Sequence, residues 1–231
     1  MGILRRYIYI LAGRDVYYPL QYKCPCEKHG SDYGGWYICP QGIDRESIIY
    51  SIGVGEDVSF DLSLIEKYGL TVHAFDPTPM SIRWVKAQQL PQKFHFYDFG
   101  IADFDGTTKF YPPENPDYVS HTITPNPRSS GEPIVVKMHR LSTIMQMLGH
   151  TRIDILKMDI EGAEYEVIDD IIRNEIDIRQ ILVEFHHRFS YVDVGWTRDA
   201  VEKLNGSGYR IFYISSLGEE YCFIRPETEK Q

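Results

Sequence analysis

The feature that most constrains the fold is a regular alternation of strand-like and helix-like stretches, which begins at Ile48 and continues to Arg225. Apolar runs bounded by turn residues predict buried strands, and apolar residues at helical spacing between them predict helices. This alternation indicates a parallel sheet with helices on both faces. The last two strands, "YRIFYIS" and "EYCFIRP", are joined by "SLGE" and predict a hairpin, so one strand runs antiparallel. We therefore expect an α/β fold with a seven-stranded, mostly parallel sheet.

Two parts of the chain fall outside this alternation. Residues 1–47 are rich in Tyr, Gly and Pro without a sustained period, so they are predicted to form an N-terminal cap on a main domain of residues 48–231. Residues 112–133 are dense in Pro, Asn and Ser, and a loop of this length inside a domain is usually a functional lid or a mobile segment. With 231 residues, 43% of them hydrophobic, the chain suits one globular domain.

The charge and hydropathy of the chain narrow its partners. A net charge of −9 argues against nucleic acid or an anionic membrane as the main partner, because both favour basic patches. The apolar stretch 7–12 is shorter than the roughly 20 residues that span a bilayer. It also lacks the core and cleavage site of a signal peptide. We expect a soluble, cytoplasmic protein that acts on a small molecule or a sugar.

The cysteines near the N-terminus suggest a metal site only weakly. Cys24, Cys26 and Cys39 lie close to His29 in the sequence, and thiolate and imidazole are the usual ligands of zinc. The spacing CxC is not the common CxxC, and no second pair follows, so ordinary thiols fit better. A disulfide is less favoured still in a reducing compartment. The ends of the predicted strands show no clear set of metal ligands.

The turn after the first strand predicts a nucleotide site. Ligands of open α/β sheets bind beyond the carboxyl ends of the strands, where Gly53 and Gly55 let the backbone approach. A dinucleotide fingerprint would need a further glycine where Val58 stands. Glu56 and Asp57 would repel a pyrophosphate and suit a cation, which favours S-adenosylmethionine over NAD. The alternative is a plain strand–helix turn with a capping acid.

The next two strands end in residues suited to a nucleoside. Asp76 follows the glycine turn by about 20 residues, where an acid takes up ribose hydroxyls in such folds. It could instead only cap the helix that follows. At the exit of the third strand, Asp98 or the backbone at Gly100 could hold the adenine edge while Ile101 packs on its face. A loop acid without a ligand is the alternative for Asp98.

The fourth and fifth strands carry the residues suited to catalysis. Lys157 and Asp159 point to one side of a strand, and burying such a pair is costly without a purpose. The dipole of the following helix accounts for Glu161 but not for these two. Glu184 and His186 share a face at the end of the fifth strand. His186 is suited to general-base work because the pKa of histidine lies near neutrality, although a structural role is the alternative.

Several of these pieces together resemble the FkbM-like family of S-adenosylmethionine-dependent methyltransferases. The matching stretches are "YSIGVGEDVSFD", "VHAFDPTP", "FGIADFDGTTKFY" and "ILKMDIEGAEYEVI" with "VEFHH", which span about Ile48 to Arg225. The resemblance implies a Rossmann-like class I methyltransferase fold with an antiparallel last strand. It also implies methyl transfer to an oxygen, often on sugars or natural-product hydroxyls. The family often has Glu-Pro after the second strand, where this chain has Asp76-Pro77.

The resemblance and the strand-end residues together define a predicted site. His186 is the predicted base, with Asp159 or Glu184 orienting it or the acceptor. Glu161, Ser120 and His121 are the candidate acceptor contacts, although a solvated position in the loop fits Ser120 and His121 better. The stretch "YGGWYIC" lies outside the shared core and is expected to shape acceptor choice. An NAD-dependent oxidoreductase or epimerase, and a non-catalytic cofactor-binding module, remain the alternatives. The predicted cofactor residues are Ser51, Gly53, Val54, Gly55, Glu56, Asp57, Asp76, Pro77, Asp98, Gly100, Ile101 and Asp159.

Overall fold

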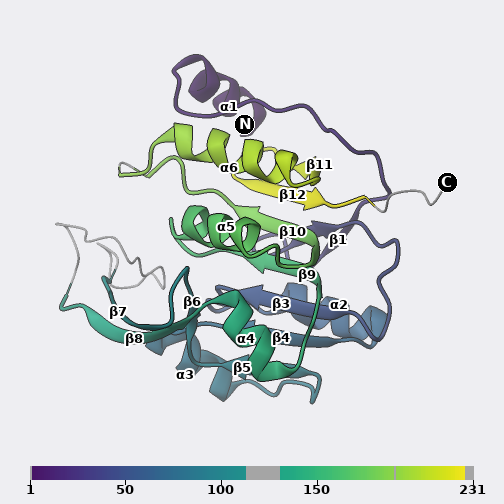
Figure 1. Cartoon of the computed structure of the whole chain (residues 1–231), viewed down its shortest axis with the longest axis vertical. Coiled ribbons are helices and arrows are strands. Elements are labelled where there is room, and N and C mark those ends of the chain that lie inside the picture. The colour runs from purple at the N-terminus through teal and green to yellow at the C-terminus, as the bar shows by residue number, and fades with distance from the viewer. Residues whose placement is uncertain (1, 113–130, 190, 227–231) are drawn as a thin grey trace.

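A seven-stranded sheet forms the centre of the computed structural model, which describes residues 2–112, 131–189 and 191–226. The spatial order of the strands is β11-β12-β10-β9-β3-β4-β5 (Figure 1). At each edge of the sheet the two neighbouring strands, β11 and β12 or β4 and β5, are also consecutive in the chain. The central neighbours β9 and β3 are far apart in the chain. The strands are β3 (Ile48–Ile52), β4 (Thr71–Phe75), β5 (Phe94–Tyr97), β9 (Ile153–Met158), β10 (Ile178–Glu184), β11 (Arg210–Ile214) and β12 (Glu220–Ile224).

The direction of the strands confirms the predicted fold class. Strands β5, β4, β3, β9 and β10 are parallel neighbours. Strand β12 is antiparallel to both β10 and β11, because the short connection after β11 closes a hairpin. The sheet is therefore mostly parallel, and its one antiparallel strand is β12, the last strand in the sequence.

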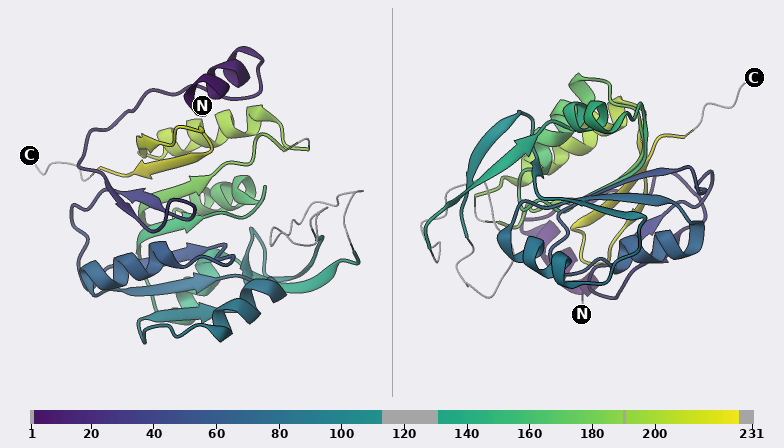
Figure 2. Two further views of the ribbon diagram at one scale, coloured as in Figure 1. Left: turned by 180° about the vertical axis from the view of Figure 1, so that it is seen from behind. Right: turned by 90° about the horizontal axis from the view of Figure 1, so that it is seen from below.

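Helices cover both faces of the sheet, as predicted (Figures 1 and 2). Helices α2 (Ser59–Tyr68) and α3 (Pro79–Ala87) lie on one face. Helices α4 (Leu141–Leu148), α5 (Glu164–Arg173) and α6 (Val194–Gly206) lie on the other. A strand covered on both sides is mostly apolar, and all six residues of β9 are buried, with Asp154 and Lys157 as its two charged residues.

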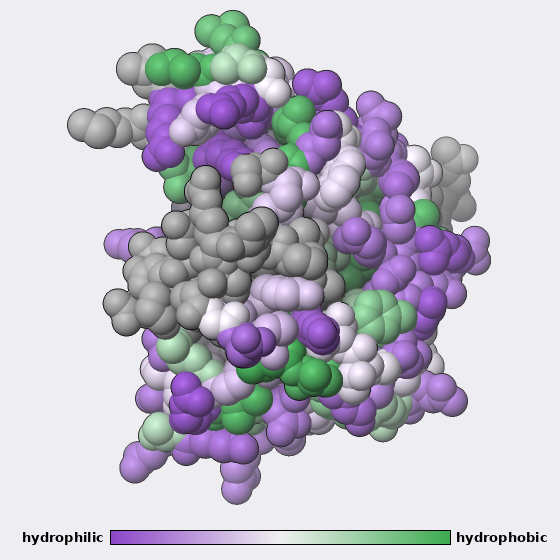
Figure 3. Space-filling view, turned by 90° about the vertical axis from the view of Figure 1, so that its left-hand side faces the viewer, coloured by the Kyte–Doolittle hydropathy of each residue, from purple (hydrophilic) through white to green (hydrophobic). Residues whose placement is uncertain are grey.

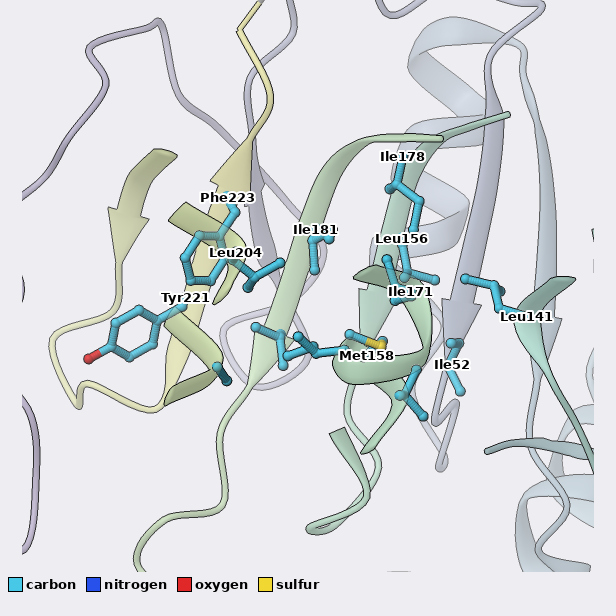
Figure 4. Packing of buried hydrophobic residues seen from close by; sticks show 14 of the residues in the cluster. Ile52, Leu141, Leu156, Met158, Ile171, Ile178, Ile181, Leu204, Tyr221 and Phe223 are labelled. Carbon is cyan, nitrogen blue, oxygen red and sulfur yellow. The ribbon is translucent and has the colours of Figure 1, made fainter. Parts of the chain in front are cut away.

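The larger hydrophobic core lies between the sheet and helices α4, α5 and α6. Figure 4 shows residues of the strands packed against residues of these helices, among which Leu141, Ile171 and Leu204 are labelled. Burial of each such side chain stabilises the fold by about 1.5–3 kcal/mol. The residues labelled there are Ile52, Leu141, Leu156, Met158, Ile171, Ile178, Ile181, Leu204, Tyr221 and Phe223.

The N-terminal residues contain short elements that sequence periodicity did not reveal. They form α1 (Gly2–Leu11) and an antiparallel hairpin of β1 (Glu27–His29) and β2 (Trp36–Ile38). The hairpin lies on the same face of the sheet as α2 (Figure 2). Strands of three residues are too short to show a period of two, and α1 carries apolar residues that stay exposed. Figure 3 shows hydrophobic side chains at the end of the molecule where α1 lies. Tyr7, Ile8 and Leu11 of this helix are 55%, 58% and 88% exposed.

Two further contacts anchor this N-terminal part on the main sheet. The backbone N–H of Cys39 donates to Oε1 of Gln180 and its carbonyl accepts from Nε2, both at 2.8 Å. The ring of Tyr37 stacks on that of Tyr213, with 3.9 Å between ring centroids. Gln180 is fully buried in β10, so the amide pair fixes the hairpin relative to the centre of the sheet.

A second sheet of three strands joins β6 (Gly100–Ile101), β8 (Ile134–His139) and β7 (Gly106–Phe110). Strand β7 pairs with β8, although the 112–133 loop separates them in the sequence. Most of that loop, with Ser120 and His121, lies outside the described residues. None of the helices in the described part of the chain has the length and apolar character needed to cross a bilayer.

Candidate active site

A cavity of about 460 Å³ opens at the carboxyl ends of β3, β4, β9 and β10. Its size lies within the range of about 300–1,000 Å³ that is usual for ligand pockets. Asp98 is exposed and is not part of the cavity lining, and Ser120 and His121 lie outside the described residues. The predicted residues that do line it are Ser51, Gly53, Val54, Gly55, Glu56, Asp57, Asp76, Pro77, Gly100, Ile101, Asp159, Glu161, Glu184 and His186.

The glycine turn is packed against the end of β9. Gly53 has φ +77°, and a Cβ there would come 1.8 Å from the carbonyl oxygen of Asp159, so no other residue fits. Lys157 stabilises the glycine turn, because its Nζ donates hydrogen bonds to the carbonyl oxygens of Ile52 at 3.2 Å and Gly53 at 2.5 Å. The Nζ also lies 5.7 Å from the ring centroid of Trp36. These contacts explain why a lysine that is 7% exposed is tolerated in β9.

Asp76 clamps the glycine turn to the start of α3. Its Oδ2 accepts from the backbone N–H groups of Val54 and Gly55, both at 3.0 Å. Its Oδ1 accepts from the backbone N–H and the hydroxyl of Thr78, both at 2.8 Å. A carboxylate offers about four acceptor positions, so protein donors already occupy the whole group. A ribose bound here would have to share these oxygens with the turn.

Asp57 is likewise engaged by the protein. Its Oδ1 accepts from the backbone N–H of Ser59 at the start of α2, and its Oδ2 accepts from the hydroxyl of Ser31, both at 2.7 Å. Burial would raise the pKa of Asp57, but the bonds from Ser59 and Ser31 outweigh it and hold that pKa below its usual value. The bond to Ser31 ties the N-terminal hairpin to the glycine turn. Glu56, by contrast, is exposed at the rim.

The acidic residues at the other side of the cavity are arranged differently. Asp159 directly follows β9 and Glu184 ends β10, and these strands are neighbours with Met158 opposite Val183. Asp159 and Glu184 therefore lie side by side at the cavity, and His186 is close to both. If one ligand atom is taken from each of these three residues, the three atoms lie within 4.8 Å of one another. Within the described residues, neither the Asp159 nor the Glu184 side chain accepts a hydrogen bond from the protein.

His186 is held by a fully buried carboxylate. Oε1 of Glu164 accepts from the backbone N–H of His186 at 2.8 Å and lies 3.3 Å from its Nδ1. The ring therefore turns Nε2 toward the cavity, 3.6 Å from Oδ1 of Asp159 and 3.6 Å from Oε2 of Glu161. Glu161 reaches this place from a backbone with φ +54°, an unfavourable conformation for a residue with a side chain.

The surrounding charges change the protonation of this group. Burial lowers the pKa of His186, but the bond and charge of Glu164 with the charges of Asp159 and Glu161 outweigh it and raise the pKa to about 10. Burial and the charge of Asp159 raise the pKa of Glu184 to about 8. A base near neutrality was the reason for choosing His186, and the structure removes that reason. His186 as the base stays a prediction without this support.

The N-terminal hairpin forms one wall of the cavity. The sequence predicted only that the stretch "YGGWYIC" shapes acceptor choice, without a position for it. Residues 32–36 line the cavity, next to the glycine turn. Gly34 permits this approach, because a Cβ there would lie 2.7 Å from Oδ2 of Asp57. The two glycines of "YGGW" were the available signal. Further lining residues not singled out beforehand are Phe60, Asp61, Thr78, Ser81, Phe110, Met138, Ile160, Ala163, Leu217 and Glu220.

The zinc site considered at the N-terminus is not assembled. His29 is buried with its Nδ1 2.8 Å from the hydroxyl of Ser63 and its Nε2 3.5 Å from Glu27. All four cysteines are free thiols. Among the described residues, the one group of three or more ligand atoms within 4.8 Å of one another is that of Asp159, Glu184 and His186. Strand pairing brought this set together, although the sequence showed no clear ligand set there.

Comparison with known proteins identifies the family of the chain. The family model "Methyltransferase FkbM domain" matches residues 33–211. The chain is 24% identical over 196 residues to "Probable methyltransferase-like protein 24" of Homo sapiens, covering 80% of this chain and 47% of that protein. It thus spans about half the length of the curated relatives it matches, which include the rat protein of the same name at 24% identity.

Solved structures of low sequence identity are also similar. One is the methyltransferase FkbM from Methylobacillus flagellatus, with TM-score 0.49 and 10% identity over 79% of this chain and 44% of that one. Another is the fibrillarin pre-rRNA processing protein of Methanococcus jannaschii, with TM-score 0.46 and 11% identity over 80% of this chain and 69% of that one.

The fold and the cavity at its strand ends are those of a class I methyltransferase. Because the family model covers well over half of its length, the chain belongs to the FkbM methyltransferase domain family. Its cofactor is S-adenosylmethionine, so the NAD-dependent alternative is set aside. The cavity suits this cofactor, since among its described lining residues the bases are Lys157 and His186 and the rest of the charged groups are acids. Those acids favour a sulfonium and an amino group over a pyrophosphate.

Proposed function

We propose that this chain transfers the methyl group of S-adenosylmethionine to a hydroxyl oxygen of a small polar acceptor such as a sugar. The observation that carries the proposal is the pair Asp159 and Glu184. Both face the cavity that holds the glycine turn, and within the described residues no protein donor satisfies either carboxylate. Carboxylates in this state favour a ligand that brings hydrogen-bond donors, as a sugar does.

The residues of the chain would act mainly by position. When bound, S-adenosylmethionine supplies an electrophilic methyl group on its sulfonium. A carboxylate oxygen of Asp159 or Glu184 accepts the hydrogen bond of the acceptor hydroxyl and directs an oxygen lone pair toward the methyl carbon. Holding two reactants in line in this way can lower the barrier by about 7–11 kcal/mol. We keep Asp159, Glu184 and His186 as the proposed catalytic residues, with Glu161 near the acceptor.

The other side of the cavity would hold the cofactor. The turn at Gly53 and Gly55 lets the backbone approach the ligand, and Asp76 keeps it in shape. We further propose that residues 1–47 form a cap segment on a methyltransferase domain of residues 48–231, with residues 32–36 as a cavity wall. The proposed cofactor residues within the cavity are Ser51, Gly53, Val54, Gly55, Glu56, Asp57, Asp76, Pro77, Gly100, Ile101 and Asp159.

A panel of acceptors with labelled S-adenosylmethionine tests the reaction. The panel pairs hydroxyl and amine versions of the same sugars and polyols and adds a short RNA. We expect label in the hydroxyl compounds, and transfer confined to amines or to RNA would contradict the proposal. Cofactor binding by calorimetry without transfer to any acceptor would favour the non-catalytic module instead. A net charge of −9 and the acidic lining support a small acceptor over RNA.

We propose the cytoplasm as the location. All four cysteines are free thiols, as a reducing compartment would leave them. Thiol titration of the protein purified from its native source without reductant should find all four reactive after unfolding. A disulfide among them would place the protein in an oxidising compartment.

A further inference from the structure

We propose that Asp159, Glu184 and His186 form a binding site for one divalent cation, with Mn²⁺ as the metal that suits them best. The three side chains offer two carboxylate oxygens and one imidazole nitrogen, all within 4.8 Å of one another. Ligands on opposite sides of an octahedral ion with bonds of about 2.1 Å lie about 4.2 Å apart. Small side-chain rotations would therefore close the set around an ion.

The orientation of His186 is the observation that points to a cation independently of the acids. Its side chain is 7% exposed, and Glu164, which is 0% exposed, holds the Nδ1 side of the ring. A metal-bound histidine usually gives its other ring nitrogen to a carboxylate in this way, which fixes both tautomer and direction. Nε2 is aimed into the acidic group, and its nearest carboxylate oxygens at 3.6 Å are beyond hydrogen-bonding distance.

The charges of the cavity also call for a cation at this place. Asp159 and Glu184 come from neighbouring strands and raise each other's electrostatic energy, and Glu161 adds a third carboxylate near His186. The nearest lysine, Lys157, is directed to the carbonyls of Ile52 and Gly53. Carboxylates that share a site in this way are costly to ionise together unless a positive charge lies between them. Without a metal ion the protonated ring of His186 supplies that charge, and a metal ion bound at Nε2 would replace the proton.

The donor set selects the metal. Carboxylate oxygens suit Mg²⁺, Ca²⁺ and Mn²⁺, whereas an imidazole suits Zn²⁺ and the later transition metals. A mixed set of one nitrogen and two oxygens favours Mn²⁺ over Mg²⁺. Three protein ligands leave coordination positions directed into the cavity, where an acceptor oxygen could bind and become easier to deprotonate. This last role rests on the proposed function, whereas the metal site itself does not.

The test measures binding of Mn²⁺ alone to the full chain after treatment with a chelator. Calorimetry and electron paramagnetic resonance should find one Mn²⁺ per chain, and pulsed resonance should detect the ¹⁴N of an imidazole next to the ion. Asp159→Asn and Glu184→Gln should each weaken binding by at least tenfold. Glu164→Gln changes the carboxylate that holds His186, and that also accepts from the N–H of Gly162, without removing a metal ligand, so it should weaken binding by about 10- to 100-fold.

Asp105→Asn is the matched control. Asp105 Oδ1 lies 3.0 Å from Nδ1 of His139 on the three-stranded sheet, so it is also a carboxylate beside an imidazole, but without a third ligand. Its substitution should leave Mn²⁺ affinity unchanged. Absence of saturable binding, binding without the ¹⁴N signal, or binding that Asp159→Asn and Glu184→Gln both retain would overturn the metal site. The ¹⁴N signal is read on the unsubstituted protein and so does not depend on how a variant folds.

The metal site and the proposed reaction fail in different ways. If Mn²⁺ binds as described but no hydroxyl compound accepts the labelled methyl group, the reaction is wrong and the site stands. If hydroxyl compounds are methylated while Mn²⁺ shows no binding to the chelator-treated chain, the site is wrong and the reaction stands.

Discussion

The two sides of the cavity hold carboxylates in opposite ways. On the cofactor side, Asp57 and Asp76 accept hydrogen bonds from backbone and hydroxyl donors and are fixed in place. On the side proposed for the acceptor, Asp159 and Glu184 face the cavity with no such donor among the described residues. The first pair is part of the scaffold, and the second is held ready for a ligand. Substitutions on the two sides should therefore fail differently, the first in stability and the second in turnover.

The largest effect should come from Glu184→Gln on the acceptor side. The change keeps the shape of the side chain but removes an acid whose pKa is raised to about 8, so at pH 9, where that acid is ionised, methyl transfer should fall by about 100-fold or more. The free energy of unfolding should stay the same or rise, because a carboxylate repelled by Asp159 is gone. Initial rates and urea unfolding measure the two quantities. If Glu184→Gln kept full turnover and normal stability, the proposed difference between the two sides of the cavity would be wrong.

Asp76→Ala should give the next effect, and mainly on stability. It leaves donors of Val54, Gly55 and Thr78 without an acceptor, so we expect a loss of about 3 kcal/mol in the free energy of unfolding. Cofactor affinity in calorimetry should fall at least tenfold as the turn loosens. Asp76→Glu is the matched control, since it keeps the charge but moves it by one methylene. If it retains stability, the clamp does not depend on the length of Asp76.

Asp57→Ala should cost about 1 kcal/mol, because it removes the acceptor of the Ser59 N–H and of the Ser31 hydroxyl. Because the pKa of Asp57 is lowered in the folded state, its contribution is present above the unfolded pKa of about 4 and is lost as the pH falls through the folded value. The difference in unfolding free energy between variant and parent should thus be present at pH 7 and shrink below about pH 4. A difference that grows on acidification would contradict the assigned role.

Asp98→Asn should have the smallest effect. Asp98 is exposed and is not among the cavity-lining residues, so cofactor affinity should change by less than twofold and stability by less than about 0.5 kcal/mol. Thermal shift with S-adenosylhomocysteine measures both. A tenfold loss of affinity would restore the earlier prediction that Asp98 holds the adenine edge.

Local patterns predicted the fold well, because each strand and helix of the sheet carries its own periodicity. The stretch "KMDIEGAE" is an example, since β9 ends at Met158 and α5 begins at Glu164, near the expected places. The N-terminal hairpin was not predicted, because its strands have three residues and pair only with each other. The pairing of β7 with β8 was also missed, because a long loop separates them in the chain.

The sequence predicted which residues belong to the site but not which of them lie next to one another. Asp159 and Glu184 are far apart in sequence, and they meet because β9 and β10 are neighbours in register. The rule that consecutive parallel strands usually lie side by side could have placed them together. The saturation of Asp76 could not be foreseen, because it depends on the backbone of the glycine turn. The pKa of His186 likewise depends on Glu164, which reaches it from a helix.

The bond between Ser31 and Asp57 joins two segments that lie apart in the sequence, and it makes the cofactor pocket a shared property of both. Residues 32–36 line that pocket, so a ligand that contacts them as well as the glycine turn would favour their docked position. By thermodynamic linkage, ligand affinity and attachment of the amino-terminal segment must reinforce each other. The rate of proteolysis near Tyr33 should then fall as ligand occupies the pocket, so this rate would measure occupancy.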